Sequence, residues 1–548
     1  MSAFRVGILD GILNSHILPT IVSRATSARR NLFPCVDASL EPWTMLEGPT
    51  AGQRRIAQSG PAMSCNPRVA IIGAGMSGIC MAITLQHFGF DTFTIYEKSV
   101  APGGTWRDNT YPGLTCDVPA RFYQFTFAPN PQWSSFFSPG PEINDYFART
   151  ANEHGLLRHT RFCTEITHAE FRNGRWLLTT ARGEQAEYDF VICGTGVLHY
   201  PRMPGIAGLD DFTGYSFHSA RWNHEIDLSD KRVGVIGTGS TGVQIVTALA
   251  GQTAHLDLFQ RTAQWVLPIP NFRYSRATKA AYRLLPPLSK LTYLGMRTVI
   301  EFLAHALTEP GWRRTAIALV CQASLYTVRD PQLREALAPD YRPMCKRLVV
   351  SSGFYQAIQR GSVHLVTTAI DHVEPRGVVT ADGVVHELDV LVFATGFDAH
   401  AFMRPMHITG RDGITLDAAW AQGPKAFQTV AMPGFPNLFM LIGPHSPIAN
   451  YSLTAIAEAQ ANYVVGWIRA WRGGEIRMVE PTQEATDRFN ARIQEALPGT
   501  VWATGCSSWY LGKDGKPELW PWKPGKHRQM LQHPSRTDYR LSLPSQIV

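Results

Sequence analysis

Two segments of the chain show the same order of hydrophobic and glycine positions. The first begins with a short apolar strand over 68–73, continues through a glycine turn and an apolar helix ending near Phe88, and closes with a strand over 92–96. The second has strands over 232–237 and 254–259 around a similar turn and helix. Short apolar runs joined by a helix are typical of buried parallel strands in βαβ units. The pattern predicts an α/β protein with two Rossmann-like dinucleotide-binding domains.

The glycines of both turns have the spacing GxGxxG. In such a loop the first glycine permits a tight turn, the second lets the backbone approach a pyrophosphate, and the third lets helix and strand pack closely. The N-terminus of the following helix then faces the phosphates. The residues predicted to bind the two cofactors here are Gly73, Gly75, Met76, Ser77 and Gly78 in the first loop and Gly237, Thr238, Gly239, Ser240, Thr241 and Gly242 in the second.

The residue that follows the second strand differs between the two units. Glu97 ends the strand of the first unit, where a carboxylate accepts hydrogen bonds from ribose hydroxyls, so this unit is expected to bind FAD or NAD. In the second unit the strand is followed by Arg261 and Thr262 without an acid. A carboxylate would repel a ribose 2′-phosphate and an arginine would bind it, so the second cofactor is predicted to be NADPH. A solvated arginine at a strand end is the alternative.

Two further strands, over 189–196 and 389–397, end in small-residue turns and predict the places where the chain crosses between domains. An ordinary buried strand with a glycine turn is the alternative for each. The resulting layout has an FAD domain in two parts, 63–200 and 390–548, an inserted NADPH domain over 205–388 with a helical insert at about 275–345, and an N-terminal extension over 1–62. That extension is interpreted as accessory, or as an over-extended start before Met63.

Composition narrows the class of protein. With 548 residues the chain exceeds one hydrophobic core. Its net charge of +7 is spread along the sequence, which suits attraction of a phosphate-bearing cofactor and argues against nucleic-acid binding. The nine cysteines include no CxxC pair, which argues against a disulfide framework and a zinc site, and favours a reducing, cytoplasmic location.

The longest apolar stretch, 291–307, is interrupted by Arg297, Glu301 and His305. These residues are four apart and therefore share one face of an amphipathic helix, so the stretch is not a membrane span. We expect this helix to pack on its own domain, with contact to lipid or to a partner as the alternative.

Three stretches outside the loops contain candidate functional residues. The first, 103–117, has glycines that let the chain follow a cofactor, aromatic rings for a flat ring system, and Asp117, whose protonation burial could tune. In the second, Lys346 could reach a 2′-phosphate and Arg347 could stabilise a developing anion. The third, 212–222, has four aromatic residues without a clear period, and is interpreted as a packed linker or as a switch between cofactors. For the first stretch the alternative is a Gly-Pro loop capped by Asp117. For the second it is a solvated basic pair at the start of a strand.

These stretches resemble the two fingerprints of the Baeyer–Villiger monooxygenases, which are class B flavoprotein monooxygenases. One fingerprint is matched by Gly103-Gly104-x-Trp106-x4-Tyr111-Pro112-Gly113-x3-Asp117, and the other by Phe212-x-Gly214-x3-His218-x3-Trp222. The two GxGxxG loops also occur in the order and at the separation that the family shows. The resemblance covers 63–548 and departs at Asn223, where Pro or Asp is usual.

The resemblance implies roles for single residues. Arg347 is similar to the arginine that stabilises a negatively charged peroxyflavin, and Asp117 is similar to the acid that positions it. His218 resembles a hinge residue that couples NADPH binding to flavin chemistry, not a proton-transfer base. Trp222 and Arg347 favour ketone oxygenation over oxidation of nitrogen or sulfur. The further cofactor contacts that it implies are Gly104, Thr105, Trp106, Tyr123, Ile166 and Leu453 for FAD, and Arg261, Thr262 and Lys346 for NADPH.

The implied reaction consumes NADPH and dioxygen. Hydride passes to FAD, the reduced flavin forms a peroxide with dioxygen, and this peroxide attacks a ketone to give an ester or lactone. A related enzyme that oxidises nitrogen or sulfur is one alternative, and a non-catalytic flavin- and NADP-binding protein is another. The set Asp117, Lys346 and Arg347 argues against the latter, because cofactor binding alone does not require it. The absence of a CxxC pair argues against a flavin disulfide reductase.

Overall fold

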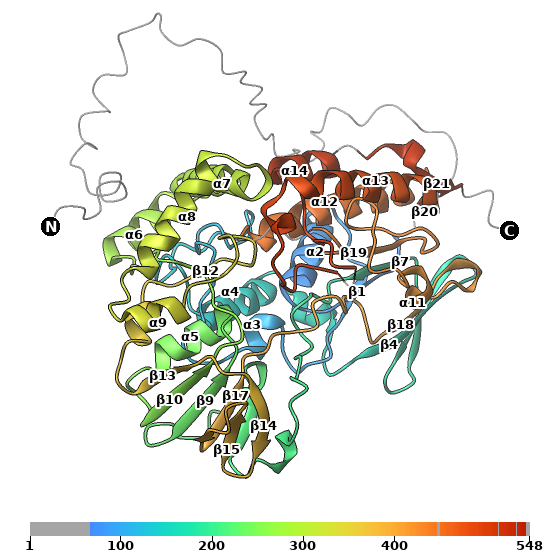
Figure 1. Cartoon of the computed structure of the whole chain (residues 1–548). Coiled ribbons are helices and arrows are strands. Elements are labelled where there is room, and N and C mark those ends of the chain that lie inside the picture. The colour runs from blue at the N-terminus through green and yellow to red at the C-terminus, as the bar shows by residue number, and fades with distance from the viewer. Residues whose placement is uncertain (1–65, 447–449, 513, 533, 544–548) are drawn as a thin grey trace, which may run out of the picture. The chain divides into compact units, whose positions relative to one another are not determined.

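A computed structural model describes residues 66–446, 450–512, 514–532 and 534–543, which belong to one compact unit, Met63–Val548 (Figure 1). The expectations for residues 1–62 lie outside the described part of the chain. Two parallel five-stranded sheets form the centre of the unit, as the two βαβ patterns predict. The predicted fold class is therefore confirmed.

The first sheet has the strand order β19-β7-β1-β2-β3, and all of its strands are parallel. Its central strand β1 is fully buried, because helices cover one face of the sheet and the antiparallel strands over 166–188 cover the other. Helix α2 (Met76–His87) begins directly after the first glycine loop and packs on α12 (Leu453–Arg472). The strands are β1 (Val69–Ile72), β2 (Phe93–Tyr96), β3 (Thr160–Arg161), β7 (Phe190–Cys193) and β19 (Leu438–Met440).

The second sheet has the order β13-β10-β9-β17-β8 and is also parallel. Helix α5 (Ser240–Leu249) follows its glycine loop as α2 follows the first. The strands are β8 (Tyr215–His218), β9 (Arg232–Ile236), β10 (His255–Phe259), β13 (Val363–Val366) and β17 (Val390–Phe393).

Two strands of the second sheet differ from the sequence expectation. The stretch 212–222 lacks a strand period, yet it contains β8 at the edge of the sheet. Tyr215 and Ser216 are exposed there and only His218 is buried, so no alternation of hydrophobic residues marks this strand. Strand β17 lies between β8 and β9, so the chain leaves this sheet after Phe393 and not before residue 390, where the boundary was predicted.

Helices fill the predicted helical segment beside the second sheet (Figure 1). Ser275 caps the first of them, since its side chain accepts a hydrogen bond from the backbone N–H of Thr278. No helix in the described ranges combines the length and apolar character that crossing a membrane requires. The four helices are α6 (Arg276–Leu284), α7 (Pro286–Thr308), α8 (Trp312–Leu325) and α9 (Pro331–Ala336).

Smaller elements complete the described unit. They form a four-stranded sheet, a three-stranded sheet, two two-stranded sheets and several helices. These elements are α3 (Thr105–Asp108), α4 (Gly140–Glu153), β4 (Ile166–Arg172), β5 (Arg175–Thr180), β6 (Gln185–Tyr188), β11 (Val266–Leu267), β12 (Val349–Val350), α10 (Phe354–Ala357), β14 (Ile370–Glu374), β15 (Gly377–Thr380), β16 (Val385–Glu387), β18 (His407–Thr409), α11 (Leu416–Ala419), β20 (Met478–Pro481), α13 (Gln483–Ala496), α14 (Pro524–Gln532) and β21 (Tyr539–Ser542).

Candidate active site

The third glycine of each loop is required by contact between helix and strand. A Cβ on Gly78 would lie 1.8 Å from the carbonyl oxygen of Gly73, and a Cβ on Gly242 would lie 1.9 Å from that of Gly237. Both first glycines have positive φ, +103° and +116°, which L side chains rarely adopt. The second loop is open at Gly239, where an added Cβ meets nothing within 4 Å. The loops therefore have the tight turn and the accessible backbone that a pyrophosphate needs.

Glu97 lies beside the first loop, at the carboxyl end of β2. Its side chain is buried and accepts hydrogen bonds from the backbone N–H groups of Ala74, at 2.8 Å, and Ser99, at 2.9 Å. Arg107 Nη1 lies 3.3 Å from the same carboxylate. The backbone N–H of Thr164 donates to the Glu97 carbonyl oxygen at 2.9 Å. Ile166, two residues later, begins β4. This fixed carboxylate at a strand end fits the ribose of an adenine dinucleotide.

The corresponding end of β10 in the second unit is basic. Arg261 is exposed, and Thr262 is held by the Thr238 hydroxyl, which donates to its carbonyl oxygen at 2.6 Å. Burial lowers the pKa of Lys346, and the positive charge of Arg261 lowers it further, while Asp340 opposes the shift. The two cations are therefore close enough to repel each other. A phosphate dianion would relieve this repulsion, so the residues fit a ribose 2′-phosphate.

Residues expected beside the flavin follow the first dinucleotide unit in the chain or pack on its core. Gly104 has a φ of +57°, and a Cβ there would lie 3.0 Å from the Cα of Gly75. Thr105 Oγ1 donates to the Leu198 carbonyl oxygen at 2.7 Å, and Trp106 Nε1 donates to the Tyr123 hydroxyl at 3.1 Å. Leu453, at the start of α12, packs against the same hydrophobic core. The structure thus places Gly104 against the first loop and brings Trp106 and Tyr123 into contact with each other.

Asp117 and Arg347 form a bidentate ion pair although they are 230 residues apart. Arg347 Nε lies 2.8 Å from Asp117 Oδ2, and Arg347 Nη2 lies 2.6 Å from Asp117 Oδ1. The Asp117 side chain is only 9% exposed. Burial is the largest influence on the pKa of Arg347 and lowers it, but the charge and hydrogen bond of Asp117, together with Tyr510 and Cys116, outweigh burial and the net shift is upward. The guanidinium therefore stays positively charged in a fixed orientation.

Two residues that the sequence did not indicate support this pair. Asn450 Nδ2 donates to Asp117 Oδ2 at 3.1 Å and to the Leu348 carbonyl oxygen at 3.2 Å. The buried phenol of Tyr510 also faces the guanidinium. Burial raises the pKa of Tyr510 to about 12, and the positive Arg347 acts in the opposite direction. Asn450 thus fixes the orientation of the Asp117 carboxylate.

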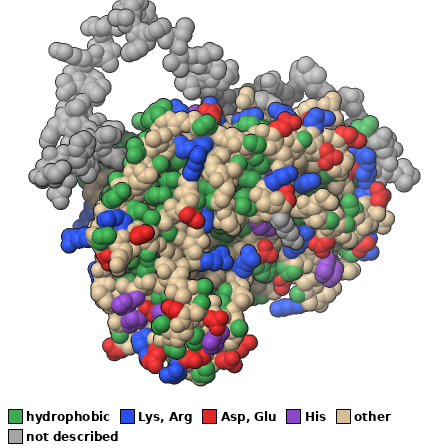
Figure 2. All heavy atoms as spheres, in the orientation of Figure 1, with side chains coloured by type: hydrophobic (Ala, Val, Ile, Leu, Met, Phe, Trp, Pro, Cys, Tyr) green, Lys and Arg blue, Asp and Glu red, His purple; other side chains and the backbone are tan. Residues whose placement is uncertain are grey.

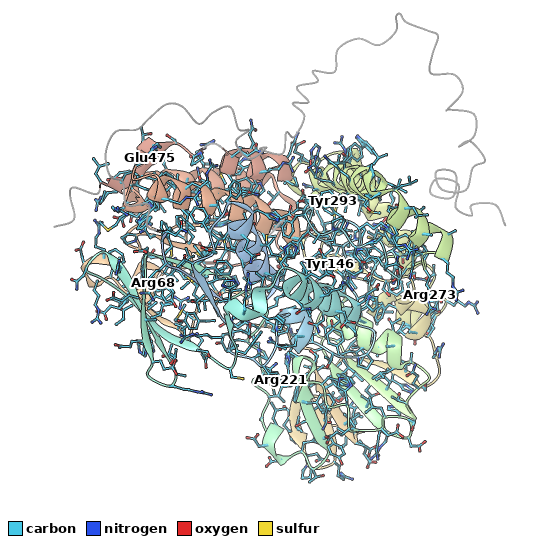
Figure 3. The ribbon with its side chains drawn as sticks, turned by 180° about the vertical axis from the view of Figure 1, so that it is seen from behind. Arg68, Tyr146, Arg221, Arg273, Tyr293 and Glu475 are labelled. Atoms are coloured by element: carbon cyan, nitrogen blue, oxygen red, sulfur yellow. A yellow bond between two sulfur atoms is a disulfide. The ribbon has the colours of Figure 1, made fainter. Side chains whose placement is uncertain are left out.

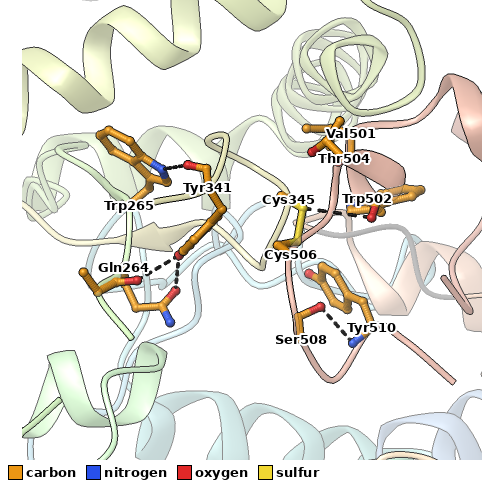
Figure 4. Close-up of a disulfide and its surroundings, with 11 residues drawn as sticks. Gln264, Trp265, Tyr341, Cys345, Val501, Trp502, Thr504, Cys506, Ser508 and Tyr510 are labelled. Atoms are coloured by element: carbon orange, nitrogen blue, oxygen red, sulfur yellow. Dashed lines mark hydrogen bonds between the residues drawn. A yellow bond between two sulfur atoms is a disulfide. The ribbon is translucent and has the colours of Figure 1, made fainter. Parts of the chain in front are cut away.

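A disulfide joins Cys345, two residues before Arg347, to Cys506 (Figure 4). The expectation that the cysteines form no disulfide framework was wrong for this pair. Spacing did not reveal the bond because its cysteines are 161 residues apart and their Cα atoms, 6.1 Å apart, meet only in the folded chain. The bond ties the Arg347 segment to the segment that carries Tyr510.

The first fingerprint also joins the two dinucleotide units. The Tyr111 hydroxyl donates to Gln244 Oε1 on α5 at 2.9 Å. A Cβ on Gly113 would lie 2.5 Å from the Gln244 carbonyl oxygen, so only glycine permits this approach. The segment 111–113 therefore rests on the helix that follows the second glycine loop, and Asp117 comes shortly after it.

His218 links β8 to the second domain crossing. Its Nδ1 accepts from the Ala220 N–H at 3.1 Å, so Nε2 carries the proton and donates to the Gly396 carbonyl oxygen at 3.0 Å. Gly396 also accepts from the N–H of Arg202, in the first crossing, at 2.9 Å. Burial lowers the pKa of His218, while the bond to Gly396 opposes the shift. Both ring nitrogens are engaged with backbone, so the imidazole connects the crossings and is not placed as a free base.

Trp222 separates two clefts beside this connection. It packs edge-on against Phe217, with ring centroids 5.1 Å apart. A cleft of about 570 Å³ runs from Tyr215 to Glu225, and a second of about 360 Å³ lies between Trp222 and the segment after β2 (Figure 3, Arg221). Asn223 accepts from the Glu225 N–H at 2.9 Å, a turn contact that Asp would also make. The departure from the family fingerprint thus leaves this turn intact.

Comparison with known proteins agrees with this geometry. Residues 66–408 match the family model described as flavin-binding monooxygenase-like. A Baeyer–Villiger monooxygenase of Streptomyces coelicolor is 36% identical over 87% of this chain and 93% of its own length. The chain belongs to the Baeyer–Villiger monooxygenases. An uncharacterized monooxygenase of Mycobacterium tuberculosis is 57% identical over 86% of this chain and 96% of its own length.

Solved structures of similar proteins extend the assignment to the cofactors. The cyclohexanone monooxygenase of Rhodococcus sp. Phi1, bound to NADP+, has a TM-score of 0.78 at 29% identity over 87% of this chain and 99% of its own. A steroid monooxygenase bound to NADP has the same TM-score at 28% identity, over 87% of this chain and all of the other. This Baeyer–Villiger family member is a flavin monooxygenase, an oxidoreductase that uses FAD, NADPH, dioxygen and a small-molecule substrate.

Proposed function

We propose that this monooxygenase inserts one oxygen atom next to a ketone carbonyl, giving an ester or lactone. The observation that carries this proposal is the bidentate pair of Asp117 and Arg347, which joins a segment after the first dinucleotide unit to a segment of the second. Bound FAD would accept hydride from NADPH and activate dioxygen. The part of the protein is to position the cofactors and to stabilise the charge that develops during oxygen transfer.

The charge of Arg347 suits a ketone better than an amine or sulfide. A ketone carbonyl is an electrophile, so oxygen must attack it as a nucleophile with negative charge. Amines and sulfides are themselves nucleophiles and need no anionic oxygen. A permanently charged guanidinium, oriented by Asp117 and Asn450, stabilises an anion in a partly buried site.

Further residues take positioning roles in this proposal. Arg261, Thr262 and Lys346 would hold the 2′-phosphate of NADPH, and Glu97 would hold the ribose of FAD. Their support is the contrast between a basic strand end and an acidic one. His218 and Trp222 would couple the two sites, because His218 bonds to the crossing at Gly396 and Trp222 lies between the two clefts.

A substrate panel tests the proposal. Purified protein with FAD and NADPH is offered cyclic, aromatic, linear and steroid ketones, and in parallel a thioether and a tertiary amine. We expect ester or lactone in amounts that match the NADPH consumed for at least one ketone. Sulfoxide or N-oxide as the only product across the panel would contradict it. An Arg347→Ala variant serves as control, since ester formation should fall far more than any sulfoxide formation.

A further inference from the structure

Helix α7 presents an uncharged apolar face to solvent. Leu291, Val299 and Phe302 are 67%, 57% and 42% exposed. They recur at helical spacing, and the exposed positions between them are Gly295 and Thr298. Large apolar side chains are normally buried, so a continuous exposed stripe indicates a surface that contacts something else.

Helix α8 continues the same surface. Trp312 and Leu319 are 66% and 59% exposed, and the exposed neighbours on their face are uncharged as well. The rings of Phe302 and Trp312 lie 6.0 Å apart, and the Arg313 guanidinium lies over Phe302 at 4.2 Å. The outward faces of α7 and α8 therefore join. Figure 2 shows hydrophobic side chains gathered over this part of the molecule.

The preceding helix α6 adds positive charge beside the apolar surface. Arg276, Lys279 and Arg283 share one face of α6. Arg273, labelled in Figure 3, precedes this helix, and Lys290 lies near the start of α7. The sequence from 258 to 300 contains no Asp or Glu. Among the ion pairs of the described residues, none involves these five cations. Their charge is therefore uncompensated within the part of the chain that the structure describes.

We infer that α6, α7 and α8 form a docking surface for an anionic lipid bilayer. Exposed Leu, Phe and Trp side chains next to Lys and Arg are the combination that inserts at a membrane interface, and the cations add attraction to anionic headgroups. Charge argues against two other occupants. A symmetric dimer through this surface would bring two acid-free cationic segments together. Residues 1–62 have six Arg against four acids, so they carry the same sign of charge.

The other side of α7 reaches the active site. Glu301 Oε1 accepts from the Tyr451 hydroxyl at 3.1 Å and from Arg528 Nη1 at 3.1 Å. Tyr451 adjoins Asn450, which bonds to Asp117. The buried ring of Tyr293 packs against Phe122 with centroids 5.2 Å apart (Figure 3). One helix thus separates the docking surface from the Asp117–Arg347 pair, while its inward contacts leave the outward face free to bind lipid.

Vesicle co-sedimentation of the full-length, FAD-loaded protein tests this inference. The probes are vesicles of phosphatidylcholine alone and vesicles of equal parts phosphatidylglycerol and phosphatidylcholine. We expect binding to the mixed vesicles to be at least tenfold stronger and to weaken as salt is raised, because salt screens the headgroup attraction. The triple variant Arg276→Glu, Lys279→Glu, Arg283→Glu should lose at least tenfold in this binding. The double variant Trp312→Ser, Leu319→Ser should lose as much at every salt concentration.

Matched controls separate docking from folding. Arg172→Glu with Arg182→Glu reverses exposed cations elsewhere, and Val100→Ser removes an exposed apolar side chain elsewhere. All variants should keep their FAD absorbance. Controls that weaken binding as much as the α6 and α8 variants, or a wild-type protein that binds neither vesicle, would overturn the inference. A concentration-dependent dimer in sedimentation velocity that the Trp312, Leu319 variant abolishes would also overturn it, since a second copy would then be the partner.

Discussion

The two dinucleotide units have the same loop and opposite strand ends. In both loops, a Cβ added to the third glycine would lie less than 2 Å from the carbonyl oxygen of the first glycine. The first unit ends its second strand with buried Glu97, which accepts two backbone N–H groups. The second ends with exposed Arg261, close enough to Lys346 to lower its pKa. We therefore propose that the loop sets where a pyrophosphate binds and that the strand end sets which ribose is accepted.

The charged pair proposed to act in oxygen transfer belongs to neither glycine loop. Asp117 follows the first unit and Arg347 follows the helical segment of the second, so their ion pair spans both. The segment 111–113 on α5 and the His218 bond to Gly396 span them as well. In the proposed function, cofactor binding is local to each unit, whereas oxygen transfer depends on how the units meet. Variants of the loops and variants of the contacts between the units should therefore have different effects.

Breaking the joint between the units should have the largest effect. Arg347→Ala removes the cation, and we expect ester formation to fall by about 10²–10³-fold, the usual result of removing one group that stabilises a transition-state anion. Reduction of FAD by NADPH, followed by stopped-flow absorbance without oxygen, should change by less than about tenfold, since both loops remain intact. Arg347→Lys is the control for charge without bidentate geometry. Retained ester formation in the alanine variant would reject this role.

Adding one methyl group to either glycine loop should affect only the cofactor of that unit. In Gly78→Ala the new Cβ meets the Gly73 carbonyl oxygen, and the equivalent clash occurs in Gly242→Ala. We expect the free energy of unfolding to fall by about 1–3 kcal/mol in each, as for overpacked cores. The first variant should purify without yellow FAD, and the second should keep FAD but resist reduction by NADPH. Gly466→Ala on α12 is the control, because it lies outside both loops and its Cβ meets nothing within 4 Å. Equal loss of FAD in the first two would contradict separate sites.

Removing the cation at the end of β10 should reduce the preference of the second unit for NADPH over NADH. Without Arg261 the 2′-phosphate loses a charged hydrogen bond, which is worth about 1.5–3 kcal/mol. The KM for NADPH of Arg261→Ala should therefore rise by about ten- to a hundredfold, while the KM for NADH stays within about twofold. Lys346→Ala should behave alike. Steady-state kinetics with both cofactors measures this, with Arg329→Ala as the control. A similar rise for NADH would refute the phosphate contact.

Lowering the pH should weaken the hydrogen bond between His218 and Gly396, and this is the smallest of the expected effects. The pKa of this histidine is lowered in the fold, below its unfolded value of about 6.5, so the unfolded chain binds the proton more tightly. The stability that neutral His218 provides is present above pH 6.5 and is lost as pH falls through that value toward the folded pKa. Melting temperatures between about pH 5 and pH 8 should decline less steeply for His218→Gln. A wild-type slope in that variant would show that other groups set the decline.

Much of the fold and of the site could be predicted because the signals are local. Gly73 to Glu97 and Gly237 to Arg261 are each one continuous strand, turn, helix and strand. Asp117 and Arg347 were predicted as partners from the family resemblance, and the structure places them in contact. Gly104 also lies against the first loop, and Trp106 and Tyr123 contact each other.

The remainder depends on contacts between distant segments. Asn450 bonds to Asp117 across 333 residues, and the Cys345–Cys506 bond spans 161. Sequence spacing identifies neither the partner of a single Asn nor the partner of a cysteine outside a recognised motif. Strand β8 was missed for a different reason, since its exposed edge position gives no alternating pattern.

Isotope incorporation from dioxygen tests the central claim most directly. The protein is supplied with FAD, NADPH, ¹⁸O₂ and the ketone that best stimulates NADPH consumption, and the product is analysed by mass spectrometry. Ketone oxygenation predicts an ester or lactone with one ¹⁸O atom per NADPH oxidised, and loss of that product in Arg347→Ala. Consumption of NADPH with all ketone recovered unchanged, or label found only in sulfoxide or N-oxide products of parallel reactions, would contradict it.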